Sequence, residues 1–389
     1  MKDSHLLHIG FLTPEYPHKM VNYSAGIGTS LKNLIDSLVN LGCRVSVFIY
    51  NQPHFDFIEE GNLTLHLLQN TPSGSFSWYQ NRKRINRYIE YFIATEKIKL
   101  LEVPDWTGIS SFMSFSCPVV VRLHGSDGFF CFLEQRKQKL KNRLLEKLAL
   151  KKCDALISPN KFTLETTQRV FEIDAFKRFS IINLGIDLST FGTPDYTGYV
   201  PKTVYYIGTI IRKKGVFYLP LIFEEILKID PEVQFFLIGN DSPDVFTGSD
   251  STWHLLENEF ASDVFSKVNY LGKIDYSEVA AELKKANVCL FPSNAETTGM
   301  VTLEAMAMGK AVVTSNEEWS KEIIDHEKNG FRVNPSDPKK FAKVVCSILA
   351  NPQLIKDLGK MARFKIELEF DANVTAKKNL EFYKEVIGS

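Results

Sequence analysis

The stretch from Pro292 to Thr314, PSNAETTGMVTLEAMAMGKAVVT, combines two glutamates, a glycine turn and a helix start in one short βαβ passage. The apolar run 287–292 reads as a buried parallel strand, Val301–Met308 as a helix that Gly309 ends, and Ala311–Thr314 as the next strand. Ligands bind at the carboxyl ends of parallel strands, where a helix N-terminus offers unpaired N–H groups to an anion. The passage therefore predicts a phosphate site.

Two carboxylates flank this predicted site. Glu296 precedes the helix and Glu304 follows eight residues later, while Thr298 is the candidate N-cap before Gly299. Carboxylates accept hydrogen bonds from vicinal hydroxyls, so an anion with hydroxyl-rich groups at both ends, such as a nucleotide-sugar, suits this spacing. The alternative is a solvated loop glutamate beside a glutamate that merely favours helix formation.

This E-x7-E spacing resembles the signature of the retaining GT-B glycosyltransferases of glycosyltransferase family 4. The resemblance implies an α/β fold of two Rossmann-like doubly wound parallel-sheet domains that face each other across a cleft. It implies that Glu296 binds the donor sugar and that Glu304 holds the ribose hydroxyls. The family often has Gly-Phe after the first glutamate, where this chain has Thr297 and Thr298.

The resemblance also assigns the start of the helix to the donor. The backbone N–H groups of Gly299, Met300 and Val301 are expected to face the sugar and the diphosphate. Thr298 is expected to bind the donor with them.

The length of 389 residues favours two domains, and a composition with 44% hydrophobic and 24% charged residues is typical of globular proteins. Prolines and turn-forming residues in 191–201 predict a linker there. We therefore expect an N-terminal domain over 1–190 and a second domain over 202–370, and the resemblance implies that the first lies on the acceptor side and that the second binds the nucleotide-sugar. By the resemblance, a last helix in 371–389 returns to the first domain.

The chain opens with a predicted strand, His5–Thr13, followed by the glycine loop AGIGT and a helix. Gly26 and Gly28 allow close approach of a ligand, but Leu31 stands where a dinucleotide fingerprint requires its third glycine, so a dehydrogenase is disfavoured. The loop could also be a simple tight turn. The resemblance places Gly28 over the donor diphosphate and Gly26 on the acceptor side.

Two further strands end at the same predicted sheet edge, in EVPDW and in the segment that leads to His124. A histidine just past a parallel strand can hydrogen-bond a sugar hydroxyl, and the resemblance places His124 near the transferred sugar; the alternative is a structural loop histidine. Glu102, Asp105 and Asp127 are expected on the acceptor side.

In the second half, TIIRKKG follows the strand that ends at Gly208 and brings three cations to the top of the sheet. Cations there suit a diphosphate. The family commonly has an arginine after the strand glycine and a lysine before the last glycine. Lys214 matches that lysine, whereas Thr209 replaces the arginine, and Arg212 is expected to compensate. A cationic surface loop is the alternative.

The segment Glu134–Lys152 carries eight Lys or Arg against two glutamates, with leucines at 140, 144 and 148 in helical spacing. Two interpretations remain open: a solvated face over a leucine core stripe, or a basic helix that binds an anionic membrane surface. A second basic and aromatic segment, Trp78–Arg87, precedes it and is expected beside the acceptor.

Composition excludes several classes. The formal net charge is zero, which disfavours wholesale nucleic-acid binding. Six cysteines without a C-x-x-C pair, and the lack of an 18-residue apolar run or a signal-peptide layout, predict a cytoplasmic protein, with peripheral contact to the inner membrane face as an option. No metal-ligand spacing is present, so neither a metal nor another cofactor is expected.

Together these features predict a retaining glycosyltransferase, a hexosyltransferase of class EC 2.4. It would move sugar from a UDP- or GDP-sugar to a hydroxyl of a glycan or polyprenyl-linked acceptor, in surface polysaccharide or glycoconjugate biosynthesis. His124, Lys214 and Glu296 are the expected catalytic residues. The alternatives are a GT-B nucleotide-sugar 2-epimerase, which needs no acceptor, and a noncatalytic nucleotide-sugar-binding partner.

Overall fold

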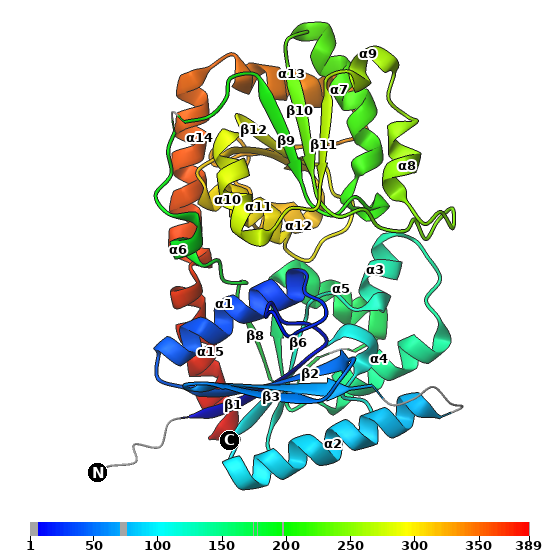
Figure 1. The fold of residues 1–389 in the computed structure, drawn as a ribbon, viewed down its shortest axis with the longest axis vertical. Helices are drawn as coiled ribbons and strands as arrows, with labels where there is room; N and C mark the ends of the chain where they lie inside the picture. Colours follow the sequence, from blue (N-terminus) through cyan, green and yellow to red (C-terminus); the bar gives the residue numbers. More distant parts are fainter. Residues whose placement is uncertain (1–6, 71–75, 174, 177, 197, 389) are drawn as a thin grey trace. The chain divides into compact units, whose positions relative to one another are not determined.

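A computed structural model describes residues 7–70, 76–173, 175–176, 178–196 and 198–388. The chain divides into two compact units (Figure 1). The first combines Met1–Gly185 with Ala372–Ser389, and the second is Ile186–Asp371. The predicted linker, residues 191–201, lies within the second unit, where the short helix α6 (Leu188–Phe191) packs against α10 and α11.

The first unit is an eight-stranded α/β layer in which helices alternate with strands. Its elements are β1 (His8–Thr13), α1 (Gly26–Asn40), β2 (Arg44–Gln52), β3 (Asp56–Glu60), β4 (Leu63–Gln69), α2 (Ser77–Glu96), β5 (Leu100–Pro104), the 3₁₀ turn η1 (Trp106–Gly108), β6 (Val119–Arg122), α3 (Asp127–Leu133), α4 (Leu140–Lys152), β7 (Ala155–Ser158), α5 (Lys161–Phe171), β8 (Phe179–Ile181) and α15 (Ala372–Ile387).

The strand order of the first sheet is β3-β4-β2-β1-β5-β6-β7-β8, and all pairs are parallel except β3 with β4. The sheet is covered on both faces. One core joins β1 and β2 to α1 and α15, with Leu34 and Tyr383 among its residues, and another includes Ile89 of α2 and Phe171 of α5. Burial on both faces explains why every residue of β1 is buried and why its centre, Ile9 to Leu12, carries no polar side chain.

The second unit contains the predicted E-x7-E passage. Its elements are α6, β9 (Thr203–Ile207), the 3₁₀ turns η2 (Arg212–Lys214) and η3 (Val216–Tyr218), α7 (Leu219–Ile229), β10 (Gln234–Ile238), α8 (Thr252–Glu257), α9 (Ser262–Phe265), β11 (Val268–Gly272), α10 (Tyr276–Lys285), β12 (Val288–Phe291), α11 (Met300–Ala307), β13 (Ala311–Ser315), α12 (Glu318–Lys321), β14 (Phe331–Val333), α13 (Pro338–Leu349), α14 (Pro352–Lys365) and the π-helical turn η4 (Ile366–Phe370).

All described strand pairs of the second sheet are parallel, in the order β11-β10-β9-β12-β13-β14. In its core, the ring of Phe223 from α7 stacks on that of Phe235 from β10, and apolar residues of α13 such as Phe341 belong to the same cluster. Two doubly wound parallel sheets are the architecture that the sequence predicted. The predicted strand Ala311–Thr314 is β13, which continues one residue further to Ser315, whereas the predicted His5 start of the first strand lies outside the described residues.

Candidate active site

Two loops at the carboxyl edge of the second sheet bring Lys214 and Glu296 into contact. The carbonyl oxygen of Lys213 accepts the backbone N–H groups of Asn294 (2.9 Å) and Ala295 (3.2 Å), which ties the turn η2 to the segment after β12. As a result the Lys214 Nζ forms an ion pair with the Glu296 carboxylate, and both side chains are mostly buried. Two residues that the sequence analysis expected to be catalytic therefore lie in contact at one edge of the second sheet.

Gly215 makes this close approach possible. Its φ is +71°, in the left-handed region, and a Cβ there would overlap the carbonyl oxygen of Pro292. Only glycine accepts both the backbone angle and the contact. Gly215 therefore sets the distance between the loop that carries Lys214 and the loop that carries Glu296.

Helix α11 starts with an uncapped N-terminus next to this ion pair. Its N-cap is Gly299 (φ +75°), without a side-chain cap, so the prediction that Thr298 caps the helix is wrong. The Thr298 Oγ1 is instead buried and has no hydrogen-bond partner among the described residues, and Thr298 is 2% exposed. The first N–H groups of a helix have no intrahelical partner, which leaves those of Met300 and Val301 available to a ligand.

Glu304 lies in the second turn of α11 and is 4% exposed. Its Oε1 accepts a hydrogen bond from the Tyr276 hydroxyl at 2.9 Å. Burial raises the pKa of Glu304 to about 7, against the Tyr276 hydrogen bond and the charge of Lys214, which lower it. The carboxyl group therefore changes charge near neutral pH.

Arg212 has a strong partner within the second unit. Its guanidinium donates to both Asp244 oxygens at 2.9 and 2.8 Å and lies over the ring of Phe217 at 4.2 Å. The pair lowers the pKa of Asp244 to about 2. Gly208, at the end of β9, is buried and places this loop at the sheet edge.

In the first unit, the predicted glycine loop is filled by a side chain of the protein. Glu15 is buried, and its Oε1 accepts the N–H of Gly28 at 2.6 Å. Burial raises the pKa of Glu15, and hydrogen bonds from Gly28, Ala25 and Ile27 lower it. Gly26, the first residue of α1, is exposed.

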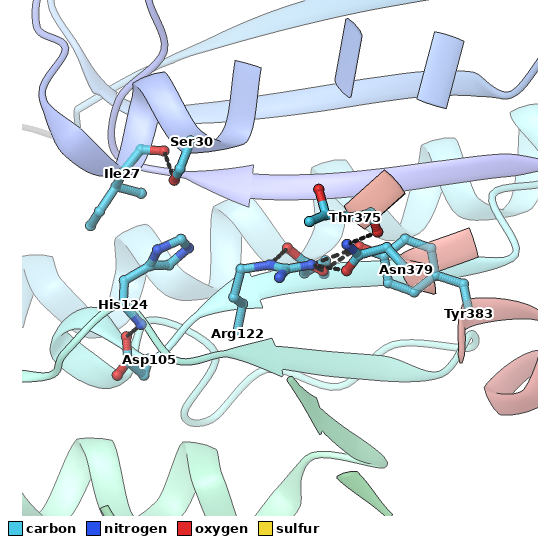
Figure 2. Close-up of polar contacts among 9 residues, drawn as sticks. Ile27, Ser30, Asp105, Arg122, His124, Thr375, Asn379 and Tyr383 are labelled. Carbon is cyan, nitrogen blue, oxygen red and sulfur yellow. Dashed lines mark hydrogen bonds and ion pairs between the residues drawn. The ribbon is translucent and has the colours of Figure 1, made fainter. Parts of the chain in front are cut away.

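His124 follows β6, with Asp105 directly below its backbone (Figure 2). The Asp105 carboxylate accepts the N–H groups of His124 (3.0 Å) and Gly125 (3.2 Å). Burial, assisted by the charge of Arg122, lowers the pKa of His124 to about 3, so its imidazole is neutral at physiological pH. Asp127 accepts a hydrogen bond from Asn142 at 3.1 Å. A neutral imidazole can still donate and accept hydrogen bonds with sugar hydroxyls.

Arg122, Asn379 and Tyr383, which Figure 2 shows side by side, form a buried network with Glu102. Glu102 forms a two-point ion pair with Arg122 at 2.7 and 2.8 Å, and Arg122 also donates to Asn379 (2.5 Å) and contacts the Tyr383 hydroxyl (3.1 Å). The hydrogen-bonding capacity of Glu102 and Asp105, both expected on the acceptor side, is therefore directed to the protein itself.

Sequence reasoning did not identify Glu15, Tyr276 or Glu146, whose carboxylate accepts N–H groups of the loop after His124. Glu15 lies only 13 residues before Gly28, between the end of a strand and the glycine loop. A carboxylate in that position could have indicated from the sequence that it binds the loop. Tyr276 and Glu304 are 28 residues apart, and no local spacing links them.

Two general features of the described residues bear on function. Their His, Cys, Asp and Glu side chains form no group of three or more that could hold a metal ion. Within the same part of the chain, every helix is too short or too polar to cross a bilayer.

Comparison with known proteins covers most of the chain. The profile of Glycosyltransferase Family 4 matches residues 24–190, and the profile of the Glycosyl transferases group 1 matches residues 200–365. An uncharacterised glycosyltransferase of Methanocaldococcus jannaschii is 23% identical over 347 residues, which is 87% of this chain and 88% of the relative. The phosphatidyl-myo-inositol mannosyltransferase of Mycolicibacterium smegmatis is 22% identical over 384 residues, 94% of this chain and 91% of the relative.

Solved structures show the same fold. Sucrose-phosphate synthase from Thermosynechococcus elongatus superposes with a TM-score of 0.80 at 21% identity, covering 98% of this chain and 99% of that one. HepE of Anabaena, solved with UDP and glucose, gives a TM-score of 0.70 at 18% identity over 97% of this chain and 99% of that one.

Two parallel-sheet α/β units with these structural neighbours define a GT-B fold. The chain belongs to the GT-B glycosyltransferases of family 4, and it is a transferase of class EC 2.4. The predicted family, fold and enzyme class are confirmed.

Proposed function

We propose that this glycosyltransferase transfers a sugar from a nucleoside diphosphate sugar, UDP- or GDP-linked, to an acceptor hydroxyl with retention of the anomeric configuration. The observation that carries the proposal is the Lys214–Glu296 ion pair beside the uncapped N-terminus of α11. A cation, the first N–H groups of α11 and the Thr298 hydroxyl, which has no partner within the described part of the chain, meet at one sheet edge, and together they suit a diphosphate that ends in a sugar.

In this mechanism, departure of the nucleoside diphosphate is the difficult step. Lys214 and the N–H groups of Met300 and Val301 stabilise the negative charge that grows on the leaving phosphate, the N–H groups from the start of α11 and the Lys214 ammonium once it has left Glu296. Glu296 holds the donor sugar and orients the Lys214 ammonium. Release of Lys214 from Glu296 toward the phosphate is the expected response to donor binding.

Other residues receive narrower roles. Glu304, held by Tyr276, binds the ribose hydroxyls. Arg212, with its guanidinium on Asp244, supports the loop that carries Lys214 instead of contacting the diphosphate. In the first unit, neutral His124 hydrogen-bonds the transferred sugar, and Asp105 and Glu102 act on the protein backbone and on Arg122.

For the acceptor, we favour a glycan or polyprenyl-linked glycan, as used in surface polysaccharide or glycoconjugate synthesis. Support comes from an aromatic–basic surface in the first unit, formed by Trp78, Tyr79, Phe112, Leu140, Lys141 and Leu144. Lys141 lies over the Trp78 ring at 4.4 Å, and Tyr79 and Phe112 pack edge to face. Leu140 is 84% and Leu144 57% exposed. Exposed leucines beside lysines suit an anionic lipid surface.

Donor screening tests the proposal. UDP-, GDP- and ADP-sugars are incubated with and without oligosaccharide and polyprenyl-linked acceptors, in the presence of EDTA, and nucleoside diphosphate release is measured. Acceptor-dependent release with one donor is expected to persist in EDTA, and NMR should show the donor's anomeric configuration in the product. An inverted product, or a requirement for a divalent cation, contradicts the mechanism. A 2-epimerised sugar formed without acceptor identifies an epimerase.

A further inference from the structure

Backbone N–H groups of the loop from His124 to Gly128 donate hydrogen bonds to two buried carboxylates. Asp105, after β5, accepts the N–H groups of His124 and Gly125. Glu146, on α4, accepts those of Asp127 and Gly128, each at 3.0 Å, and also accepts from the Gln138 amide at 2.7 Å. Four backbone N–H groups of residues 124–128, which comprise the loop after β6 and the first two residues of α3, are therefore held by two side chains from separate elements.

Both carboxylates are costly to bury. Asp105 is 1% exposed and Glu146 0%, and none of their described hydrogen bonds comes from a cation. Burial raises the pKa of each to about 7, and the charge of Glu146 adds to the rise at Asp105. An apolar side chain would fill such a site at lower cost. A contribution to the stability of the fold does not account for two buried carboxylates at this place. The loop conformation that they fix does account for them.

The two carboxylates also lie on backbone segments that cannot shift independently. Gly108, three residues after Asp105, has a φ of +54°, and a Cβ there would overlap the backbone of Leu145 and Glu146. On the loop itself, a Cβ on Gly128 would meet the Phe171 ring at 2.7 Å. Asp105, Glu146 and the loop therefore form one closely packed assembly.

We propose that Glu146 is a positioning residue of the transfer reaction: together with Asp105 it fixes the backbone of residues 124–128 and thereby the imidazole of His124. This inference rests on the role of His124 in the proposed function. Glu146 itself touches no substrate, because its carboxylate is fully enclosed and its described partners are the loop and Gln138.

The first test needs no activity. Glu146→Gln keeps the side-chain volume but turns one acceptor oxygen into an NH₂ donor that faces an N–H group. Amide hydrogen exchange of the peptide that contains residues 124–128 is expected to accelerate about tenfold, with distant peptides unchanged. Glu172→Gln is the matched control, since Glu172 pairs with Arg143 and Lys147 of the same helix but is exposed. Unchanged exchange in Glu146→Gln overturns the proposal.

The second test links the loop to the reaction. Glu146→Gln is expected to lower kcat about tenfold to a hundredfold, as small displacements of reacting groups do, with the dissociation constant for the free nucleotide unchanged. In His124→Ala, adding Glu146→Gln should lower kcat less than twofold further, because both changes act through the same imidazole. Glu146→Asp, which retains a carboxylate, should recover part of the rate.

Each remaining outcome has a distinct meaning. Wild-type kcat in Glu146→Gln, or fully additive losses with His124→Ala, overturns the proposal while transfer activity itself stands. If only the melting temperature falls and each folded molecule retains its kcat, Glu146 is structural and the proposal fails. If no donor supports transfer by the wild-type protein, the proposed function fails, and the exchange experiment still reports on the loop.

Discussion

Glu296 and Glu304 belong to the same short passage but have different surroundings. Glu296 faces the ammonium group of Lys214, whereas Glu304 is enclosed by the protein and held by a tyrosine hydroxyl. Changes at Glu296 are therefore expected to affect turnover, because charge at the leaving phosphate appears only in the transition state. Changes at Glu304 are expected to affect donor binding, because ribose contacts are present throughout the reaction.

Removal of either member of the Lys214–Glu296 pair should lower turnover. Lys214→Ala and Glu296→Gln are each expected to reduce kcat at least about a hundredfold, since one preorganised group directed at developing charge contributes roughly 2.7 to 4 kcal/mol. Circular dichroism should show an intact fold. Lys321→Met, which removes an exposed lysine paired with Glu318, is the control. Near wild-type turnover in both site variants would remove this pair from the active site.

Glu304 should make donor binding depend on pH. Its pKa is about 7, and the ionised carboxylate is the better acceptor for ribose hydroxyls, so the donor KM is expected to fall as pH rises from 6 to 8. Tyr276→Phe removes a hydrogen bond that lowers this pKa, so the same fall in KM should move to higher pH. Steady-state kinetics measure the donor KM of both proteins from about pH 5.5 to about pH 9, a range that spans the pKa of Glu304. An identical KM profile in both proteins contradicts the assignment.

The sequence, together with the family resemblance, could predict that Glu296, Glu304 and Lys214 lie near one another in the second unit, because each lies at a fixed offset from a strand end or a glycine. It could not predict that Arg212 faces Asp244, since that choice depends on a loop 32 residues later. Likewise, Glu102 and Asp105 follow a strand as expected for a ligand site, but only the packed structure shows that Arg122 and the His124 backbone take up their oxygens.

At the scale of elements, the turn η2 and the segment after β12 act together through Gly215. Gly215→Ala should lower the melting temperature and the turnover, because the new Cβ overlaps the Pro292 carbonyl. Gly61→Ala is the matched control: its φ is +64°, close to that of Gly215, so it adds left-handed strain of about 1 to 2 kcal/mol, but the new Cβ meets no atom within 4 Å. Equal losses in the two variants would show that strain, and not contact between the loops, is responsible.

Helix α4 illustrates a limit of periodicity. The spacing suggested a core stripe of leucines at 140, 144 and 148, but the buried residues of this helix are Leu145, Glu146, Ala149 and Leu150. The buried face of α4 includes Glu146, and a search for apolar residues at helical spacing does not place a glutamate in the core. The spacing of the leucines therefore predicted the wrong buried face. The outward leucines then remain for the proposed lipid contact.

This contact should depend on both charge and apolar side chains. The wild-type protein is expected to sediment with anionic vesicles at low salt and to lose binding above physiological salt, where the screening length falls below about 8 Å. Replacing Lys137, Lys139, Lys141 and Arg143 by glutamine should abolish binding, at roughly 1 kcal/mol per cation.

Leu140→Ser with Leu144→Ser should weaken binding at every salt concentration. Lys161→Gln, which changes an exposed lysine at the start of α5, serves as the control. If the wild-type protein ignores anionic vesicles even at low salt, α4 is a solvated helix and a soluble acceptor is favoured.

At the scale of the whole molecule, the first unit depends on a helix from the far end of the chain. Asn379 and Tyr383 of α15 complete the hydrogen bonds of the buried Arg122–Glu102 pair. The two-domain α/β architecture followed from the length and from repeated strand–helix alternation. The particular partners of Arg122 did not, because they are separated from it by 257 and 261 residues.

Breaking this network should destabilise the protein. Arg122→Met leaves the Glu102 carboxylate buried without a cation and is expected to cost about 3 to 5 kcal/mol. Tyr383→Phe removes one hydroxyl and should cost about 1 to 3 kcal/mol. Chemical denaturation, followed with a spectroscopic probe in the first unit, measures the free energy of unfolding of both variants. A larger loss in Tyr383→Phe than in Arg122→Met would show that the hydroxyl, and not the ion pair, dominates.

The placement of α15 also orders events during synthesis. Every residue of the second unit, Ile186–Asp371, is translated before the helix that closes the first unit emerges. Until then, the face of the first sheet that α15 covers is open, and Arg122 and Glu102 lack two of their partners. A nascent chain thus completes the second unit before the first, and a stop codon anywhere in the second unit leaves neither unit intact.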